Sequence, residues 1–514
     1  MREVSLINLP VELHTSILMF LLSLSRKPSA GATEIALLLG FTPPPGPDLV
    51  VWEWKEHDTR SGTLFPFNVS RVCKLWHDIL ARIPECWTRV VFDLVSYPDL
   101  FLDAFTWSRN LENIEVVVFS SSEYTADVDE EREKRRVSAI AQALQPHVHR
   151  CQSITFDIIY SSSLPPPSVF FLQDAPNLQQ LILECRVDNF DLTSHVPSPN
   201  LEGVRLPFAT SFTKLWKLSL PGFWLIDMPL STPDSEWLNK LDSSKMDVAI
   251  ANFEFPQTGQ YSLTNFLHCL CQLKEPNSIS FQSLSLSYGY CGDNFNSLHS
   301  ANLTYAISSN IHFTTVSEGF LAHLYSIADI VSDEILSFED CAIPNISHLQ
   351  YVRYIHLENI VDDQGQSLRN ILAAWEGTSL SIQSCSSFDD TFLSWLSSVQ
   401  EYIRIDTEGN RVLIKAFPAE NLTSLRITDC VNFTAPALME VVKSRSDSHL
   451  ELEESGLDRP PYTSPRDSLS VTGRGPPFTL GNVSLDWLYK KSDYIKVNWH
   501  TENDEEEEQW YANG

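Results

Sequence analysis

The sequence predicts an α/β protein in which short parallel strands alternate with helices along a repeat array, after a small all-helical module. Three observations support this fold class. Pairs of apolar residues recur at separations of roughly 19 to 27 residues through the second half of the chain, the period of strand–helix repeats. Two segments near the N-terminus carry apolar residues at helical spacing. The length of 514 residues exceeds what one compact core covers.

The first helix is predicted to start at Pro10, because proline suits the first turn, where its missing N–H costs nothing. Its apolar stripe consists of Leu13, Ile17, Leu18 and Leu21. A second segment repeats this spacing and is ended by Pro84; its apolar residues are Val69, Val72, Cys73, Trp76, Ile79, Leu80 and Ile83. Neither helix can bury its stripe alone, so we expect the two to pack together and against a further surface.

The two segments read L-I-N-L-P-V-E-L-H-T-S-I-L from Leu6 and N-V-S-R-V-C-K-L-W-H-D-I-L-A-R-I-P-E-C-W from Asn68. The ordered series L-P-x-E-L, V-C-x-x-W and P-x-x-W resembles the F-box, which docks a protein onto the Skp-type adaptor of a cullin ubiquitin ligase. The resemblance implies a module over residues 1–88. It implies that the adaptor is bound by Leu9, Pro10, Leu13, Ile17, Leu18, Val72, Cys73 and Trp76.

The module departs from an ordinary F-box because an insertion at 23–66 separates its halves. Such insertions are familiar in F-box-like proteins of mushroom-forming fungi, which the chain resembles. A surface insertion costs little stability, since closure entropy grows only logarithmically with length. We expect T-E-I-A-L-L-L-G from Thr33 to form a short helix and Trp52–Trp54 to pack back on the module. The rest of the insertion is expected to project to the side, and docking requires that it leave the adaptor face clear.

Beyond the module, N-L-T-S-L-R-I-T-D-C from Asn421 matches the leucine-rich pattern L-x-x-L-x-L-x-x-C/N. Counting from Ile427 gives the apolar pairs Leu284/Leu286, Ile311/Phe313, Leu336/Phe338, Ile355/Leu357, Leu380/Ile382, Ile403/Ile405 and Leu450/Leu452. Three pairs are followed by a cysteine at a position that turns inward in such repeats: Cys341, Cys385 and Cys430. We expect these cysteines to be buried structural residues.

The N-terminal half of the array is less regular, with separations of 14 to 38 residues. Its pairs are Val116/Val118, Ile154/Phe156, Leu181/Leu183, Val204/Leu206 and Leu218/Leu220. Phe92 lies 26 residues before Val118, in step with the array. No repeat can be assigned from Pro221 to Pro276. The sequence predicts a leucine-rich-repeat solenoid over 89–456, because stacked units bury one continuous core.

Leucine-rich proteins usually bind partners on the concave side of the sheet, between and just after the inward leucines. The residues at those positions are His356, Glu358, Ser381, Gln383, Arg404, Asp406, Arg426, Thr428, Glu451 and Glu453. This surface is polar and of mixed charge, which suits recognition of a protein client. Residues 457–499 are predicted to form a loop and a C-terminal cap with a helix at Leu485–Tyr489 and a strand at Tyr494–Trp499. We expect residues 500–514 to form an acidic, disordered tail.

Composition and motifs exclude several functions. The formal net charge of −30 argues against nucleic acid and anionic membrane as partners, since both require a basic surface. Scattered cysteines and the absence of a signal peptide indicate an intracellular protein, cytoplasmic or nuclear. No catalytic, phosphate-binding or cofactor motif occurs, and H-C-L-C from His268 has the wrong spacing for zinc. We therefore expect no enzyme activity, no cofactor and no metal.

Two hypotheses remain open. In the first, the chain is the substrate-recognition subunit of a Skp–cullin–F-box ligase. In the second, it is a leucine-rich scaffold whose helical module only caps the array. Exposure of the Leu13 stripe in the isolated chain distinguishes them.

Overall fold

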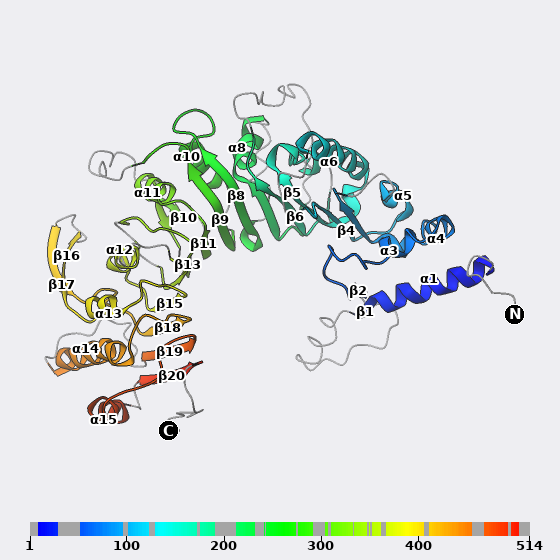
Figure 1. Cartoon of the computed structure of the whole chain (residues 1–514). Coiled ribbons are helices and arrows are strands. Elements are labelled where there is room, and N and C mark those ends of the chain that lie inside the picture. The colour runs from blue at the N-terminus through cyan, green and yellow to red at the C-terminus, as the bar shows by residue number, and fades with distance from the viewer. Residues whose placement is uncertain are drawn as a thin grey trace. The chain divides into compact units, whose positions relative to one another are not determined.

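The computed structural model describes residues 9–28, 52–95, 101–122, 129–171, 175–190, 212–231, 241, 243–273, 276–290, 304–306, 310–332, 334–346, 349, 352–360, 366–405, 411–454, 467–491 and 495–502. These residues form a mixed α/β fold with parallel sheet (Figure 1). The chain divides into two units, Met1–Lys217 and Leu218–Gly514. Each unit is described by itself.

Unit 1 begins with helices at the positions that the sequence predicts. α1 spans Val11–Ser25, and Pro10 lies at its N-cap. The second predicted helix is broken in two, α3 (Phe67–Ser70) and α4 (Lys74–Leu80), because Cys73 is extended with a φ of −160°. α4 ends at Leu80, before the predicted end at Pro84, and Pro84 instead starts the short 3-10 helix Pro84–Trp87. The two predicted helices do pack together, as α1 contacts α4.

The strands of unit 1 follow directly from this module. β3 (Arg89–Asp93), β4 (Ile114–Phe119), β5 (Cys151–Tyr160) and β6 (Gln180–Val187) are adjacent and parallel. Phe92 pairs with Val118 and Val118 with Phe156, which confirms the predicted register. The intervening helices include α5 (Ala104–Trp107), α6 (Glu130–Leu144) and α7 (Ser168–Phe171). The predicted pair Val204/Leu206 lies outside the described residues.

Trp87 joins the module to the first strand. It is fully buried, and its indole N–H donates to the carbonyl of Leu80 at 2.9 Å. Its ring lies 5.8 Å from Phe67 and 4.7 Å from Trp107, measured between centroids. The buried rings of Phe67, Trp87 and Trp107 give α3, α4 and the start of β3 a shared core, since large aromatic rings contribute much of the buried apolar area.

Unit 2 contains ten adjacent strands in the order β7-β8-β9-β11-β13-β14-β15-β18-β19-β20. Their bounds are β7 (Lys217–Pro221), β8 (Asp247–Phe255), β9 (Ser278–Leu286), β11 (Asn310–Thr314), β13 (Ile335–Glu339), β14 (Tyr354–Glu358), β15 (Ser379–Gln383), β18 (Ser424–Thr428), β19 (Asp467–Gly473) and β20 (Ile495–Thr501). The helices are α8 (Gly222–Ser231), α10 (Leu263–Leu270), α11 (Glu318–Ile327), α12 (Gln366–Ala374), α13 (Asp390–Leu396), α14 (Ala435–Glu454) and α15 (Asn482–Lys491). Helices α11 to α14 lie on one side of the strands (Figure 1).

One backbone feature repeats at the same register of successive strands in unit 2, inside β8 and β9 and at or directly after the end of β11, β13, β14, β15, β18 and β19. The residue at this register has a left-handed φ near +50° in Asn252, Ser283, Thr315, Asp340, Asn359, Ser384 and Asp429, and Gly473 has a φ of +74°. From Thr315 to Asp429, the N–H of this residue donates to the carbonyl at the end of the next strand of the sheet, as from Asn359 to Gln383 at 2.9 Å. Small polar residues and glycine tolerate this conformation best. The repeat is therefore encoded in the backbone as well as in the apolar pairs.

The three cysteines predicted to turn inward, Cys341, Cys385 and Cys430, are each at most 1% exposed. Burial raises the pKa of Cys341 and Cys385 to about 11 and that of Cys430 to about 12. They are neutral thiols at neutral pH, and we call them the ladder cysteines. Their predicted structural role agrees with this burial.

Two predicted repeat strands are wrong, and one predicted pair is out of register, because Ile311 and Phe313 pair with Ile279 and Phe281 and not with Leu284 and Leu286. Ile403/Ile405 lies in β16 (Gln400–Ile405), which pairs antiparallel with β17 (Arg411–Ala416), while β15 pairs directly with β18. Leu450/Leu452 lies in helix α14. The strand that follows β18 is instead β19, within the segment predicted to be a loop. The predicted terminal helix and strand are confirmed as α15 and β20, whereas residues 503–514 lie outside the described residues.

Candidate functional site

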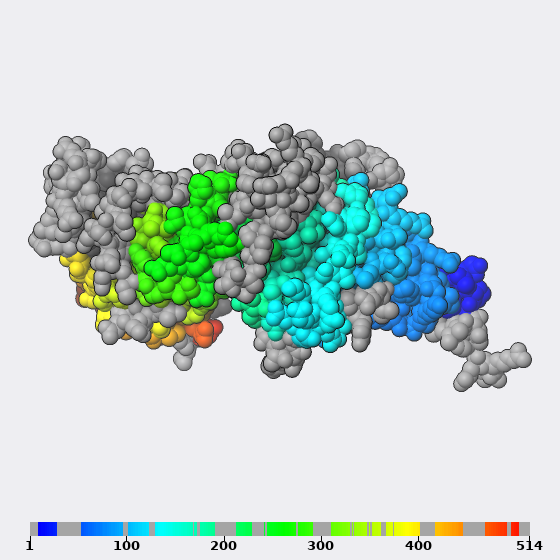
Figure 2. Space-filling model, turned by 90° about the horizontal axis from the view of Figure 1, so that it is seen from above, coloured from blue at the N-terminus to red at the C-terminus, as the bar shows by residue number. Residues whose placement is uncertain are grey.

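Helix α1 carries two apolar stripes side by side, and only one of them is buried. His14, Leu18 and Leu22 face the protein and are at most 6% exposed. The second stripe consists of Leu13, Ile17, Phe20 and Leu24. These four residues follow the spacing i, i+4, i+7 and i+11, which places them on one helix face. α1 protrudes at the end of unit 1, in dark blue (Figure 2).

The second stripe is exposed. Leu13 is 49% exposed, Phe20 61% and Leu24 50%, and Ile17 is partly exposed. Val72, between α3 and α4, is 64% exposed. Isolated apolar residues on a surface are ordinary, but a contiguous set on one helix face marks an interaction site. We call Leu13, Ile17, Phe20, Leu24 and Val72 the α1 surface.

Trp76 connects α4 to α1. Its indole N–H donates to Nδ1 of His14 at 2.9 Å, and the two rings meet edge to face with centroids 6.2 Å apart. Trp76 remains partly exposed, whereas His14 is 2% exposed. The hydrogen bond fixes the orientation of the indole, so Trp76 lies on α1 as a rigid, amphipathic contact residue.

The predicted adaptor-binding residues lie on or beside α1 and α4, which contact each other, and one of them is buried. Leu9, Ile17, Cys73 and Trp76 are partly exposed, and Pro10, Leu13 and Val72 are exposed. Leu18 is fully buried, because its position on α1 faces the core of unit 1, so it cannot contact an adaptor directly. Phe20 and Leu24 were missed by the sequence reasoning. Their signal is the i, i+4, i+7, i+11 spacing from Leu13.

The two ends of the insertion do not project away, contrary to the prediction. β1 (Arg26–Pro28) and β2 (Trp52–Trp54) form an antiparallel hairpin, and Trp54 is 9% exposed. The guanidinium groups of Arg26 and Arg89 lie 4.5 and 4.6 Å from the centroid of the Trp54 ring. The predicted packing of Trp52–Trp54 on the module is thus confirmed for Trp54. Residues 29–51, with the predicted short helix, lie outside the described residues.

The segment after β2 also contacts the first strands. Arg60 forms an ion pair with Asp157 on β5, and its guanidinium lies 5.7 Å from the ring centroid of Phe119 on β4. Arg89 Nη1 donates to the carbonyl of Glu56 at 2.5 Å. The returning arm of the insertion therefore lies against β3 to β5 within unit 1.

In unit 2, six predicted client-binding residues share one face of the sheet. His356, Ser381 and Arg426 are in register with one another, as are Glu358, Gln383 and Thr428. Gln383 Nε2 donates to Glu358 Oε1 at 2.6 Å, and His356 Nε2 lies 3.4 Å from Glu358 Oε2. Register extends the first row to Ser337 and His312, which the prediction missed. Burial lowers the pKa of His312, and His356 lowers it further.

Three predicted client-binding residues do not belong to this face. Arg404 lies in β16, which forms its own two-stranded sheet with β17. Glu451 and Glu453 lie in helix α14, because the apolar alternation around them is part of a helix. Asp406 lies outside the described residues.

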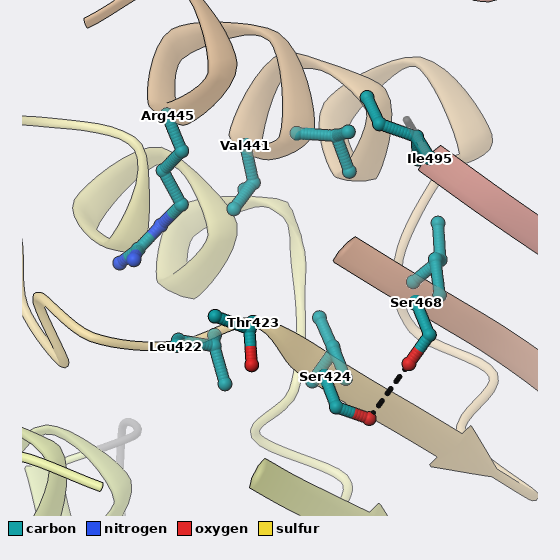
Figure 3. A pocket seen from close by; sticks show the side chains of 10 residues that line it. Leu422, Thr423, Ser424, Val441, Arg445, Ser468 and Ile495 are labelled. Atoms are coloured by element: carbon teal, nitrogen blue, oxygen red, sulfur yellow. Dashed lines mark hydrogen bonds between the residues drawn. The ribbon is translucent and has the colours of Figure 1, made fainter. Parts of the chain in front are cut away.

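The pocket in Figure 3 lies between the starts of β18 and β19 and helix α14. Its lining is largely apolar, with Leu422, Val441 and Ile495, and Arg445 points toward the loop before β18. Arg445 donates to the carbonyls of Ala419 at 3.0 Å and Leu396 at 3.3 Å. The Arg445 guanidinium therefore holds these two backbone carbonyls in place. Among the described residues that line the pocket, no nucleophile is paired with a base.

Within the described ranges, no group of three or more His, Cys, Asp or Glu side chains could hold a metal ion. In H-C-L-C, Cys269 is buried and Cys271 exposed, so the two thiols point in different directions at the end of α10. Among the described helices, none is long and apolar enough to cross a bilayer.

Comparison with known proteins adds no assignment: no protein-family model matches the chain, and a search of curated proteins finds no match.

Proposed function

We propose that this chain is the substrate-recognition subunit of a Skp–cullin–F-box ubiquitin ligase. The α1 surface docks the Skp-type adaptor, and the open face of the sheet in unit 2 binds a protein client. The chain makes no covalent bond itself and uses no cofactor. Its contribution is proximity, which raises the effective concentration of the client near the conjugating enzyme.

One observation carries the proposal: the helix that contains L-P-x-E-L exposes its second apolar stripe in the isolated chain. Leu13, Phe20 and Leu24 are each about half exposed or more. A helix that only capped the array would turn all its apolar residues toward its own core. Buried aliphatic and aromatic anchors dominate interface energy, so this surface suits a folded protein partner.

The position of Trp76 adds support. In a module that only capped the array, Trp76 would be buried against the strand around Val91 to Leu94. It is instead partly exposed and hydrogen-bonded to His14 on α1. The free thiols of the described residues agree with a reducing compartment, and we propose a cytoplasmic or nuclear location.

The scaffold hypothesis is favoured by a different observation. Leu18, Leu22, Leu80 and Trp87 are all buried, so the module contributes to the core of unit 1. This packing is compatible with docking, because the buried and exposed stripes of α1 are separate. The scaffold hypothesis predicts that the exposed stripe binds no adaptor.

The test is co-precipitation of the ligase from cell extract with the tagged full chain. Wild type is expected to recover the Skp-type adaptor and the cullin. Leu13→Asp combined with Trp76→Ala should lose both, because a charge would be buried in the interface and an aromatic anchor removed. Equal recovery by the double variant would reject the docking assignment. As a control, Arg132→Ala changes an exposed residue of α6 and should recover the ligase normally.

A further inference from the structure

A row of four side chains crosses the open face of the sheet in unit 1 and combines one aromatic ring with three carboxylates. Asp93, Phe119, Asp157 and Glu184 are in register on β3, β4, β5 and β6. Each directly follows a core residue of its strand, so the row lies on the face opposite to the core. We call these four residues the acidic row. An aromatic ring beside a carboxylate suits a guanidinium, since both attract it.

An arginine of the chain itself occupies this row. Arg60 forms an ion pair with Asp157, and its guanidinium lies 5.7 Å from the ring centroid of Phe119. Phe119 is only 5% exposed, although it lies on the open face. Arg186 on β6 also approaches Asp157, with Nε 3.9 Å from Oδ1, but its guanidinium donates to two backbone carbonyls. Arg60 is therefore the residue that places a guanidinium on the aromatic member of the row.

Arg60 belongs to a segment whose two ends are buried and whose middle is exposed, and we call this segment, residues 55–63, the strap. Trp54 before the strap is 9% exposed and Leu64 after it 4%. No residue of the strap itself is buried. Among the described residues, no hydrogen bond between backbone groups joins the strap to β3, β4 or β5. The strap is held there through the side chains of Arg60 and Arg89. Such a segment can open locally while the sheet stays folded.

The strap crosses the strands with basic side chains over acidic ones. Burial raises the pKa of Glu115 on β4, and the charges of Arg89 and His57 oppose this rise, so His57 of the strap lies near this carboxyl. Arg60 pairs with Asp157 on the next strand, β5. The open face of unit 1 therefore attracts basic side chains, and the strap supplies them from the same chain.

We propose that the acidic row is a binding site for an arginine side chain of a partner peptide, and that Arg60 closes this site as an intramolecular competitor. The inference goes beyond the proposed function, because neither the α1 surface nor the client face of unit 2 includes these residues. An exposed ion pair and an exposed cation–π contact each contribute little. A partner that adds further contacts can therefore displace the strap, and its own guanidinium then meets Phe119 and Asp157.

Isothermal titration of three end-blocked pentapeptides into the full chain tests the site. The peptides are Gly-Thr-X-Ser-Gly, in which X is arginine, lysine or citrulline, which has the shape of arginine without its charge. Arg60→Ala vacates the row and should bind the arginine peptide about 10-fold more tightly than wild type, because a site that is open about one time in ten binds about 10-fold more weakly. In this variant the citrulline peptide should bind at least about 10-fold more weakly than the arginine peptide, with lysine between them.

Three results of this titration would overturn the proposal. Equal affinity of wild type and Arg60→Ala for the arginine peptide would show that Arg60 does not compete for the site. Equal affinity of Arg60→Ala for the arginine and citrulline peptides would show that the row does not recognise a guanidinium. Absence of binding to Arg60→Ala would show that no peptide site is opened.

Further variants locate the site. Asp157→Asn combined with Arg60→Ala should lose the preference for arginine over citrulline, because asparagine keeps the shape of Asp157 without its charge. A retained preference would place the peptide elsewhere and contradict the assignment. Arg132→Ala removes an exposed arginine of α6 and should bind all three peptides like wild type. If Arg132→Ala gained as much affinity as Arg60→Ala, net charge would be the cause and the strap would have no role.

Hydrogen exchange followed by mass spectrometry measures the opening of the strap directly. The amides of residues 55–63 should exchange several-fold faster in Arg60→Ala than in wild type, and faster in wild type when the arginine peptide is added. Unchanged exchange in both cases would show that the strap does not open. The side chain of Arg60 is 52% exposed, so Arg60→Ala should keep the urea midpoint of wild type. A clearly lower midpoint would make Arg60 a structural residue and would contradict its role as a competitor.

Discussion

Leu18 and Phe20 lie two positions apart on α1, and we predict that replacing each with alanine has opposite consequences. Leu18 is fully buried, so Leu18→Ala should lower the free energy of unfolding by about 2–5 kcal/mol, through lost burial and the cavity left behind. Phe20 is 61% exposed, so Phe20→Ala should change it by no more than about 0.5 kcal/mol. The larger side chain is therefore expected to be the less important for folding.

The assay is urea unfolding followed by tryptophan fluorescence, because Trp76 contacts α1 through His14 and Trp87 is buried in the same unit. Leu18→Ala should unfold at clearly lower urea, while Phe20→Ala should follow wild type. A Phe20→Ala variant as destabilised as Leu18→Ala would show that Phe20 packs on this chain. In that case the second stripe of α1 would not be a free surface and could not dock an adaptor.

Three further predictions concern packing and ionisation. Trp54→Ala removes the ring that contacts Arg26 and Arg89 and should cost about 3–5 kcal/mol of stability; an unchanged urea midpoint would refute this. Burial raises the pKa of Glu133 above 4.5, outweighing hydrogen bonds from backbone N–H groups. Its contribution is thus fully present below about pH 4.5 and lost as pH rises through the raised pKa, so Glu133→Gln should remove this part of the slope of stability against pH; a slope identical to wild type would contradict it. The ladder cysteines, which are buried, should resist maleimide at pH 7.5 until urea unfolds the chain, whereas the exposed Cys271 should be labelled without urea; mass spectrometry showing labelling of a ladder cysteine in the folded chain would count against their burial.

Much of the array could be predicted because its strands are short and its apolar pairs are buried. Ile355/Leu357 and Leu380/Ile382 pair in the predicted register, and so do Phe92 and Val118. Each pair consists of two apolar residues that point inward from the same face of one strand. This pattern can be recognised within a few residues of sequence. The left-handed residue at one register of β8, β9 and most later strands adds a second local signal that the prediction did not use.

The errors arose where a local pattern fits two structures. Ile403/Ile405 alternates as a repeat strand does, and it lies about midway between β15 and β18, so it appeared in phase. Its partner is the hairpin strand β17, a choice that depends on tertiary pairing. Strand β19 was missed because Pro, Ser, Arg and Gly precede and follow its alternating Leu469 and Val471.

The candidate site was partly predictable for a related reason. Helical spacing identified α1 and most of the residues on its exposed face. Spacing alone could not distinguish the stripe of Leu18 from that of Phe20, because both are apolar and adjacent on the helix. Only the packing of α1 on α4 determines which stripe is buried. The hydrogen bond between Trp76 and His14 likewise joins residues 62 positions apart.

The central claim is that the α1 surface docks a Skp-type adaptor, and isothermal titration of purified adaptor into the full chain tests it most directly. Wild type should bind one adaptor per chain. Phe20→Asp should weaken binding by at least about 100-fold while leaving the urea midpoint unchanged, since a charge would enter the interface and no core contact is lost. Absence of binding by wild type, or equal affinity of Phe20→Asp and wild type, would contradict the account.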